Sequence, residues 1–222
     1  MSVVLVIGNK AYSSWSLRPW LLMSELGIDF DEILIPLDQP DTKARITRHS
    51  PSGRVPCLLI DDLSVWESLA IMETLAERFP DRGVWPANAE ARAVARAVSC
   101  EMHAGFQALR SACPMNLRKR FAFRDWGGQA GARDVARIQE LWADCRDRFG
   151  TGGPFLFGAF CAADAMFAPV VSRLDRYGWE VTPATRAYMD AVLALPSFER
   201  WTAQGVDEPW ILEHDEVDAP AL

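Results

Sequence analysis

Residues 50–60 have the sequence Ser50-Pro51-Ser52-Gly53-Arg54-Val55-Pro56-Cys57-Leu58-Leu59-Ile60. The opening residues are turn formers, and an apolar run follows from Cys57 to Ile60. A second apolar run, Leu63 to Trp66, comes after Asp61-Asp62, and two such runs around a polar turn are typical of a β-hairpin. Beyond the hairpin, residues 68–79 have the spacing of an amphipathic helix, with one face formed by Leu69, Met72, Leu75, Ala76 and Phe79.

The segment before residue 50 predicts a strand, a helix and a second strand. Val3 to Ile7 is a β-branched run typical of a buried strand. Residues 17–27 predict a helix, with Pro19 in the first turn and Gly27 at the stop. Phe30 to Leu37 supplies the next strand. The order βαβ followed by ββα predicts an α/β domain with a mixed four-stranded sheet.

Beyond Pro80 the sequence predicts helices only. Two apolar stripes at helical spacing indicate long helices, and residues 163–176, 183–195 and 197–204 predict three more. The stripes are Val94, Val98, Met102, Phe106 and Leu109, and then Val135, Ile138, Leu141, Trp142, Cys145 and Phe149. We therefore expect a first domain at residues 1–81, a linker at 82–86 and an all-helical domain at 87–222.

Composition excludes several classes of function. The net charge is −7 and no basic stripe stands out, so we expect no nucleic-acid partner. No apolar run is long enough to cross a membrane, and the start of the chain does not resemble a signal peptide. The five cysteines form no C-x-x-C pair, which argues against a disulfide framework and a zinc site. The acidic end of the chain is expected to be a solvated tail.

Four motifs resemble those of cytosolic glutathione S-transferases of the serine type, and their order covers nearly the whole chain. The resemblance is to bacterial-type members similar to the zeta and theta classes. The motifs are the serine loop Ser13-Ser14-Trp15-Ser16-Leu17-Arg18, the turn at residues 50–56, the helix start Glu67-Ser68-Leu69-Ala70-Ile71, and Phe157-Gly158-Ala159-Phe160-Cys161-Ala162-Ala163-Asp164.

This resemblance implies a thioredoxin-like first domain that binds glutathione and an all-helical second domain. It implies a cytoplasmic, homodimeric transferase that uses glutathione as a co-substrate, without a metal. The thiol of glutathione would attack a small hydrophobic electrophile. The resemblance also leaves three alternatives open: a glutathione-dependent isomerase similar to maleylacetoacetate isomerase, a dehalogenase, and a binding protein of this fold without catalytic activity.

Two serines are candidates for stabilising the thiolate. A free thiol has a pKa of about 8.5, and a hydroxyl donor at a helix N-terminus favours its anion. By resemblance, the theta and delta pattern points to Ser14, four residues before Arg18, whereas the zeta pattern points to Ser13. We favour Ser14, and Tyr12 is a further hydroxyl in the same loop.

The resemblance assigns five residues to glutathione itself. Val55 and Pro56 resemble the cis-proline turn that pairs with the peptide backbone of glutathione like a short extra strand. Arg54 matches a basic residue near the glycyl carboxylate. Glu67 is expected to bind the γ-glutamyl ammonium, and Ser68, at a helix start, the γ-glutamyl carboxylate.

The second-substrate pocket is expected between the domains. Its candidate residues are Trp15, Met102, His103, Phe106 and Arg110, although Met102 and Phe106 also belong to a core stripe. Trp15 stands where the zeta class has cysteine, which argues against the isomerase alternative. Asp164 is expected to cap a helix, with Cys161 in the position where the family has serine or threonine.

Overall fold

The sheet is four-stranded and mixed, as predicted. The computed structural model describes residues 2–222, and Met1 of the predicted first domain lies outside them. Strand β1 (Val3–Ile7) runs parallel to β2 (Asp31–Leu34) and antiparallel to β3 (Cys57–Ile60). Strand β4 (Leu63–Trp66) pairs with β3, so the strand order is β2-β1-β3-β4. The predicted hairpin is therefore confirmed.

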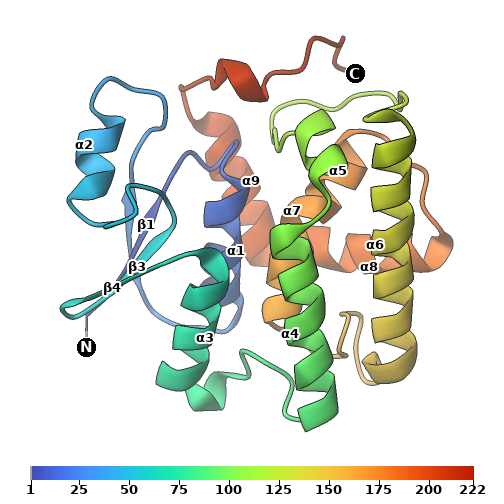
Figure 1. The fold of residues 1–222 in the computed structure, drawn as a ribbon, viewed down its shortest axis with the longest axis horizontal. Coiled ribbons are helices and arrows are strands. Elements are labelled where there is room, and N and C mark those ends of the chain that lie inside the picture. Colours follow the sequence, from blue (N-terminus) through green and yellow to red (C-terminus); the bar gives the residue numbers. More distant parts are fainter. Residues whose placement is uncertain (1) are drawn as a thin grey trace.

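Helices cover both faces of this sheet (Figure 1). Helices α1 (Ser14–Glu25) and α3 (Ser68–Arg78) pack together on the face that leads to the helical part of the molecule. Leu5 and Ile7 of β1 belong to that core, whereas Val6 between them belongs to the small cluster on the other face. This alternation follows from the two-residue period of a strand.

A short helix on the second face, α2 (Thr42–Thr47), was not predicted. Its single buried residue, Ile46, packs against Val6, Ile35 and Cys57. One buried residue makes no periodic pattern, so the sequence carries no helical signal there.

Two predicted boundaries in this half of the chain are wrong. Helix α1 begins at Ser14 rather than at residue 17, because the Ser13 side chain accepts from the Ser16 N–H and caps the helix earlier. Pro19 therefore lies inside the helix. Strand β2 ends at Leu34 rather than Leu37, before Pro36, which has no N–H for a ladder bond.

The rest of the chain is helical, as predicted. The first predicted helix is divided, because Phe106 has a φ of 57° and the chain turns there. The second predicted stripe lies on one long helix, α6 (Gly128–Phe149). The three helices predicted after it are present, with ends that differ from the predicted ones by a few residues. The helices are α4 (Ala89–Ala104), α5 (Gln107–Ala112), α6 (Gly128–Phe149), α7 (Ala162–Arg176), α8 (Pro183–Leu193) and α9 (Pro196–Asp207), with single 3-10 turns at Pro80–Arg82 and Glu213–Asp215.

Helix α7 is the centre of the molecule. Every residue from Ala162 to Leu174 is buried, and α7 packs against α1, α4 and α8. The sheet part and the helical part therefore share one core, and we keep the division into 1–81 and 87–222 as a proposal. None of the helices in residues 2–222 is both long enough and apolar enough to span a membrane.

The start of α7 carries the expected capping box. The Asp164 carboxylate accepts from the backbone N–H groups of Cys161 at 2.9 Å and Leu156 at 3.0 Å. Burial raises the pKa of Asp164 to about 6, while these hydrogen bonds lower it. The Cys161 side chain completes the box from the other side, and a thiol is a weak acceptor.

Replacing Cys161 with serine should therefore stabilise the protein. A hydroxyl accepts from the Asp164 N–H better than sulfur does, and we expect the melting temperature to rise by about 2 °C. Cys161→Ala is the matched control, because it removes the acceptor and should lower the melting temperature. Differential scanning calorimetry of the three proteins checks this, and a lower value for Cys161→Ser would contradict the assignment.

Candidate active site

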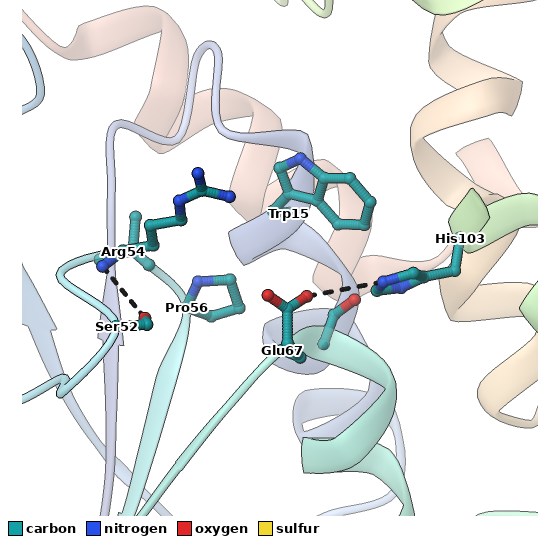
Figure 2. A pocket seen from close by; sticks show the side chains of 8 residues that line it. Trp15, Ser52, Arg54, Pro56, Glu67 and His103 are labelled. Carbon is teal, nitrogen blue, oxygen red and sulfur yellow. Dashed lines mark hydrogen bonds and ion pairs between the residues drawn. The ribbon is translucent and has the colours of Figure 1, made fainter. Parts of the chain in front are cut away.

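A cavity of about 300 Å³ opens where the sheet meets the helices (Figure 2). Its walls come from the start of α1, the loop before β3, the start of α3 and helix α4. The lining residues are Trp15, Ser52, Arg54, Val55, Pro56, Glu67, Ser68 and His103. This first cavity unites all five residues predicted to bind glutathione.

The loop before β3 offers an unpaired piece of backbone. The Val55–Pro56 peptide bond is cis. Within residues 2–222, neither the N–H nor the C=O of Val55 has a hydrogen-bond partner. Peptide groups in an extended segment beside a sheet can pair with a bound peptide in the manner of an added strand.

The start of α3 contributes a carboxylate and a hydroxyl. Glu67 precedes the helix with a φ of 68°, a conformation that is uncommon for a residue with a side chain. Its carboxylate points into the cavity and its side chain is 54% exposed. Ser68 is buried at the first helical position, where free backbone N–H groups and the helix dipole favour an anion.

Arg54 lies at the end of the first cavity opposite His103 (Figure 2). Its backbone N–H donates to the Ser52 hydroxyl at 3.2 Å. Within the described residues, the Arg54 guanidinium forms no ion pair, so its charge remains free for an anionic ligand.

A second cavity of about 290 Å³ adjoins the first, since Trp15 and Val55 line both. Its other lining residues come from the loop before α1 and the start of α1, the loop after β2, α5 and the loop after it, α7 and the end of the chain. They are Tyr12, Ser13, Ser14, Leu37, Arg110, Pro114, Met115, Arg173, Leu212, His214 and Asp215. Both predicted serines and Arg110 therefore lie together here.

The two serines differ in their hydrogen bonds. The Ser13 hydroxyl donates to Ser16 Oγ at 2.8 Å and accepts from the Ser16 N–H at 3.4 Å, so it is used by the helix cap. The Ser14 hydroxyl is half-buried and makes no hydrogen bond within residues 2–222. Of these two serines, Ser14 therefore has the free hydroxyl proton that could be donated to a ligand.

The Tyr12 hydroxyl already forms hydrogen bonds within the protein. Its hydroxyl donates to Glu216 Oε1 at 2.6 Å and accepts from Arg118 at 3.3 Å. Burial and the neighbouring Glu216 carboxylate raise the pKa of Tyr12 to about 12. Its hydroxyl is thus less suited than that of Ser14 to donate to a thiolate.

Trp15 lines both cavities and contacts two cations. The Arg18 and Arg110 guanidinium carbons are 4.2 and 4.8 Å from its ring centroid. Arg18 is buried and donates from Nε to the Met166 carbonyl at 3.0 Å. Burial lowers the pKa of both arginines. The two cation–π contacts hold the indole in place.

Two residues predicted for the second-substrate pocket are elsewhere. Met102 and Phe106 line neither cavity. Met102, on α4, and Phe106, just before α5, are both buried in the main core. His103 lines the first cavity beside Glu67 rather than the second. Of the five candidates, Trp15 and Arg110 lie in the second cavity.

The acidic end of the chain folds back over the site, contrary to the expectation of a solvated tail. The Glu208 carboxylate accepts from the N–H groups of Lys10 and Ala11. Arg118 donates to the Glu208 and Trp210 carbonyls. The tail thereby places Leu212, His214 and Asp215 in the second cavity. These three lining residues were not predicted, and neither were Ser52 in the first cavity and Arg173 in the second. Long-range contacts of single side chains leave no local pattern that could have revealed them.

No metal-binding group stands out: residues 2–222 contain no cluster of three or more His, Cys, Asp or Glu side chains placed to hold an ion.

Two family models match the chain. The model described as "Glutathione S-transferase, N-terminal domain" matches residues 12–78, and the one described as "Glutathione S-transferase, C-terminal domain" matches residues 128–203. Both domains therefore occur in the order that the motifs indicate.

Known proteins resemble the chain over most of its length. A maleylacetoacetate isomerase from Pseudomonas aeruginosa is 27% identical over 203 residues, which cover 85% of this chain and 91% of that protein. A probable maleylacetoacetate isomerase from Caenorhabditis elegans is 25% identical over 78% of this chain and 79% of its own length.

Among solved structures, a glutathione transferase homologue from Burkholderia with bound glutathione is 25% identical. The match has a TM-score of 0.69 and covers 93% of this chain and 99% of that one. The chain belongs to the glutathione S-transferase family, because the two family models, the relatives that match over most of their length and the shared fold all agree.

Proposed function

We propose that this protein is a glutathione transferase that activates the thiol of glutathione for attack on a small electrophile. The first cavity carries the proposal, because it gathers the free backbone of Val55, the Glu67 carboxylate, the N-terminus of α3 and the Arg54 cation beside Ser14. The charges and hydrogen-bonding groups are complementary to those of glutathione, a peptide with an ammonium group at one end and a carboxylate at each end.

Each end of glutathione has a matching group. Glu67 would bind the γ-glutamyl ammonium, and the Ser68 hydroxyl with the first N–H groups of α3 would bind the neighbouring carboxylate. Val55 would pair with the cysteinyl peptide groups. Arg54 would bind the glycyl carboxylate, since no acidic side chain of the described residues neutralises it.

Thiolate formation is the chemical role that we assign to the start of α1. Ser14 has a free hydroxyl and stands at a helix N-terminus, and both features favour an anion. Lowering the pKa of the bound thiol by about 2 units corresponds to about 2.7 kcal/mol of preference for the thiolate.

The second cavity would hold the electrophile next to the sulfur. Trp15, Leu37, Met115 and Leu212 give it apolar walls. The thiolate attacks an electrophilic carbon, a C–S bond forms, and the leaving group departs with its electron pair. Holding both reactants in adjoining cavities accelerates this step by proximity.

Isomerisation is the second candidate. The relatives from Pseudomonas and Caenorhabditis are named as maleylacetoacetate isomerases, and Arg110 and Arg173 give the second cavity two cations that suit a carboxylate substrate. Trp15 in place of the zeta-class cysteine favours conjugation as the main activity.

We also propose a cytoplasmic homodimer. Leu63 and Trp66 are exposed on the edge strand β4, as expected of a surface that a second copy covers. Light scattering during size-exclusion chromatography tests this assembly, and a monomer at all concentrations would contradict it.

The thiol pKa tests the activity directly. We expect the thiolate absorbance of bound glutathione to appear about 2 pH units below that of the free thiol. Ser14→Ala should bring the bound pKa back towards the free value, because the hydroxyl donor is lost. Ultraviolet titration of both complexes measures it.

Ser13→Ala is the matched control for that titration. It should lower the stability by about 1 kcal/mol through loss of the helix cap, and leave most of the thiol shift in place. Loss of the shift in Ser13→Ala but not in Ser14→Ala would reverse the assignment. Absence of glutathione binding to the unmodified protein would refute the transferase proposal.

Replacing Glu67 with glycine should increase the stability of the protein but weaken its binding of glutathione. Glycine at this position relieves the positive φ, so Glu67→Gly should gain about 1 kcal/mol in the free energy of unfolding. The same change removes the carboxylate and should weaken glutathione binding about 10-fold or more. Urea unfolding and calorimetric titration measure the two effects; a less stable variant, or one with unchanged affinity, would contradict this account of Glu67.

A further inference from the structure

His103 reaches from α4 into the first cavity and faces Glu67 (Figure 2). Its Nε2 lies 3.5 Å from Glu67 Oε2, and its ring centroid lies 5.1 Å from that of Trp15. The side chain is 29% exposed, while its Nδ1 is buried and has no hydrogen-bond partner within the described residues. The imidazole is thus fixed between an aromatic ring and the carboxylate expected to bind glutathione.

The charged groups around His103 come from several elements. They are Glu67 before α3, Arg18 of α1 and Arg110 of α5, and Arg54 stands at the far end of the cavity. Burial lowers the pKa of His103, Glu67 raises it, and Arg18 and Arg110 lower it further, so that the net pKa lies below the ordinary 6.5. The uncharged form of the ring is therefore favoured at neutral pH.

A neutral imidazole has a single N–H. Since Nδ1 has no partner and Nε2 faces a carboxylate, the tautomer with the proton on Nε2 is the favoured one. In that state the Nε2–H lies 3.5 Å from Glu67 Oε2 and, being uncharged, leaves the negative charge of the carboxylate uncancelled.

We propose that His103 is a positioning residue whose neutral Nε2–H holds the Glu67 carboxylate in place for the γ-glutamyl ammonium of glutathione. This inference rests on the proposed function. It moves His103 from the wall of the second-substrate pocket to the binding of the first substrate.

Glu67 needs such a partner. Its side chain is more than half exposed, and within residues 2–222 no side chain other than His103 forms an ion pair with its carboxylate. A carboxylate free to rotate loses conformational entropy when it binds an ammonium, and an oriented one loses less. Once protonated, His103 would instead form an ion pair with Glu67 and repel the ammonium.

Two variants distinguish the effect of the His103 N–H donor from the effect of its aromatic ring. His103→Phe keeps an aromatic ring beside Trp15 and removes the N–H. His103→Gln keeps an N–H at a similar reach and does not titrate. Two probes separate the ammonium from the rest of the ligand: glutathione, and glutaryl-cysteinylglycine, which is the same molecule without the α-amino group.

We expect His103→Phe to raise the Kd for glutathione about 10-fold, and to change the Kd for the des-amino analogue by less than about 2-fold. His103→Gln should bind glutathione within about 2-fold of the unmodified protein. In steady-state kinetics, His103→Phe should raise the KM for glutathione more than it lowers kcat. Calorimetric titration gives the Kd values.

The pH dependence supplies a second readout. The unmodified protein should lose affinity for glutathione as the pH falls through the pKa of His103, which lies below the ordinary 6.5 because burial lowers it. His103→Gln should not show this loss, and the des-amino analogue should not show it with any of the proteins.

Other results would overturn the inference. Equal weakening of both probes by His103→Phe would indicate packing against Trp15 alone. An unchanged Kd for glutathione with a raised KM for the electrophile would return His103 to the second-substrate pocket. Failure of the unmodified protein to bind either probe would overturn the proposed function and the inference with it.

Discussion

The buried guanidinium of Arg18 ties the sheet part of the molecule to its helical part. It donates from α1 to the Met166 carbonyl of α7 and lies against the face of Trp15. A buried cation without a carboxylate is costly, so it must be held by carbonyl and aromatic groups, and these groups fix its position. Trp15 is fixed with it. Since Trp15 lines both cavities, the contact that joins the two halves also determines the shape of the site.

The polar groups of the site stand where regular structure begins. Ser14 starts α1, Ser68 starts α3, and Val55 precedes β3. Backbone groups at such positions have no partner within their own element. Within residues 2–222, the groups of Val55 and the first N–H groups of α3 remain free for a ligand, whereas the Ser14 N–H donates to the Tyr12 carbonyl and only the Ser14 hydroxyl is free. The core beneath them, centred on α7, holds these starting points together. The fold thus places the hydrogen-bonding and charged groups for glutathione at or next to the starts of these elements; among them Ser68 is buried.

Much of this arrangement was predictable from sequence, because it rests on local patterns. The strands, the hairpin and α7 follow from apolar runs and spacing, and the first-cavity residues follow from motifs whose order resembles a known family. The rest depends on tertiary contacts. The turn at Phe106 interrupts an unbroken apolar stripe, so the stripe could not reveal it. The side of α4 on which His103 lies, and the tail contacts of Glu208, are set by partners distant in sequence.

A crystal structure of the protein with glutathione tests the central claim most directly. The account predicts the sulfur beside the Ser14 hydroxyl, the cysteinyl peptide groups paired with Val55, and the γ-glutamyl ammonium on Glu67 with His103 behind it. Glutathione bound elsewhere, or bound in the first cavity with its sulfur directed away from Ser14, would contradict the account.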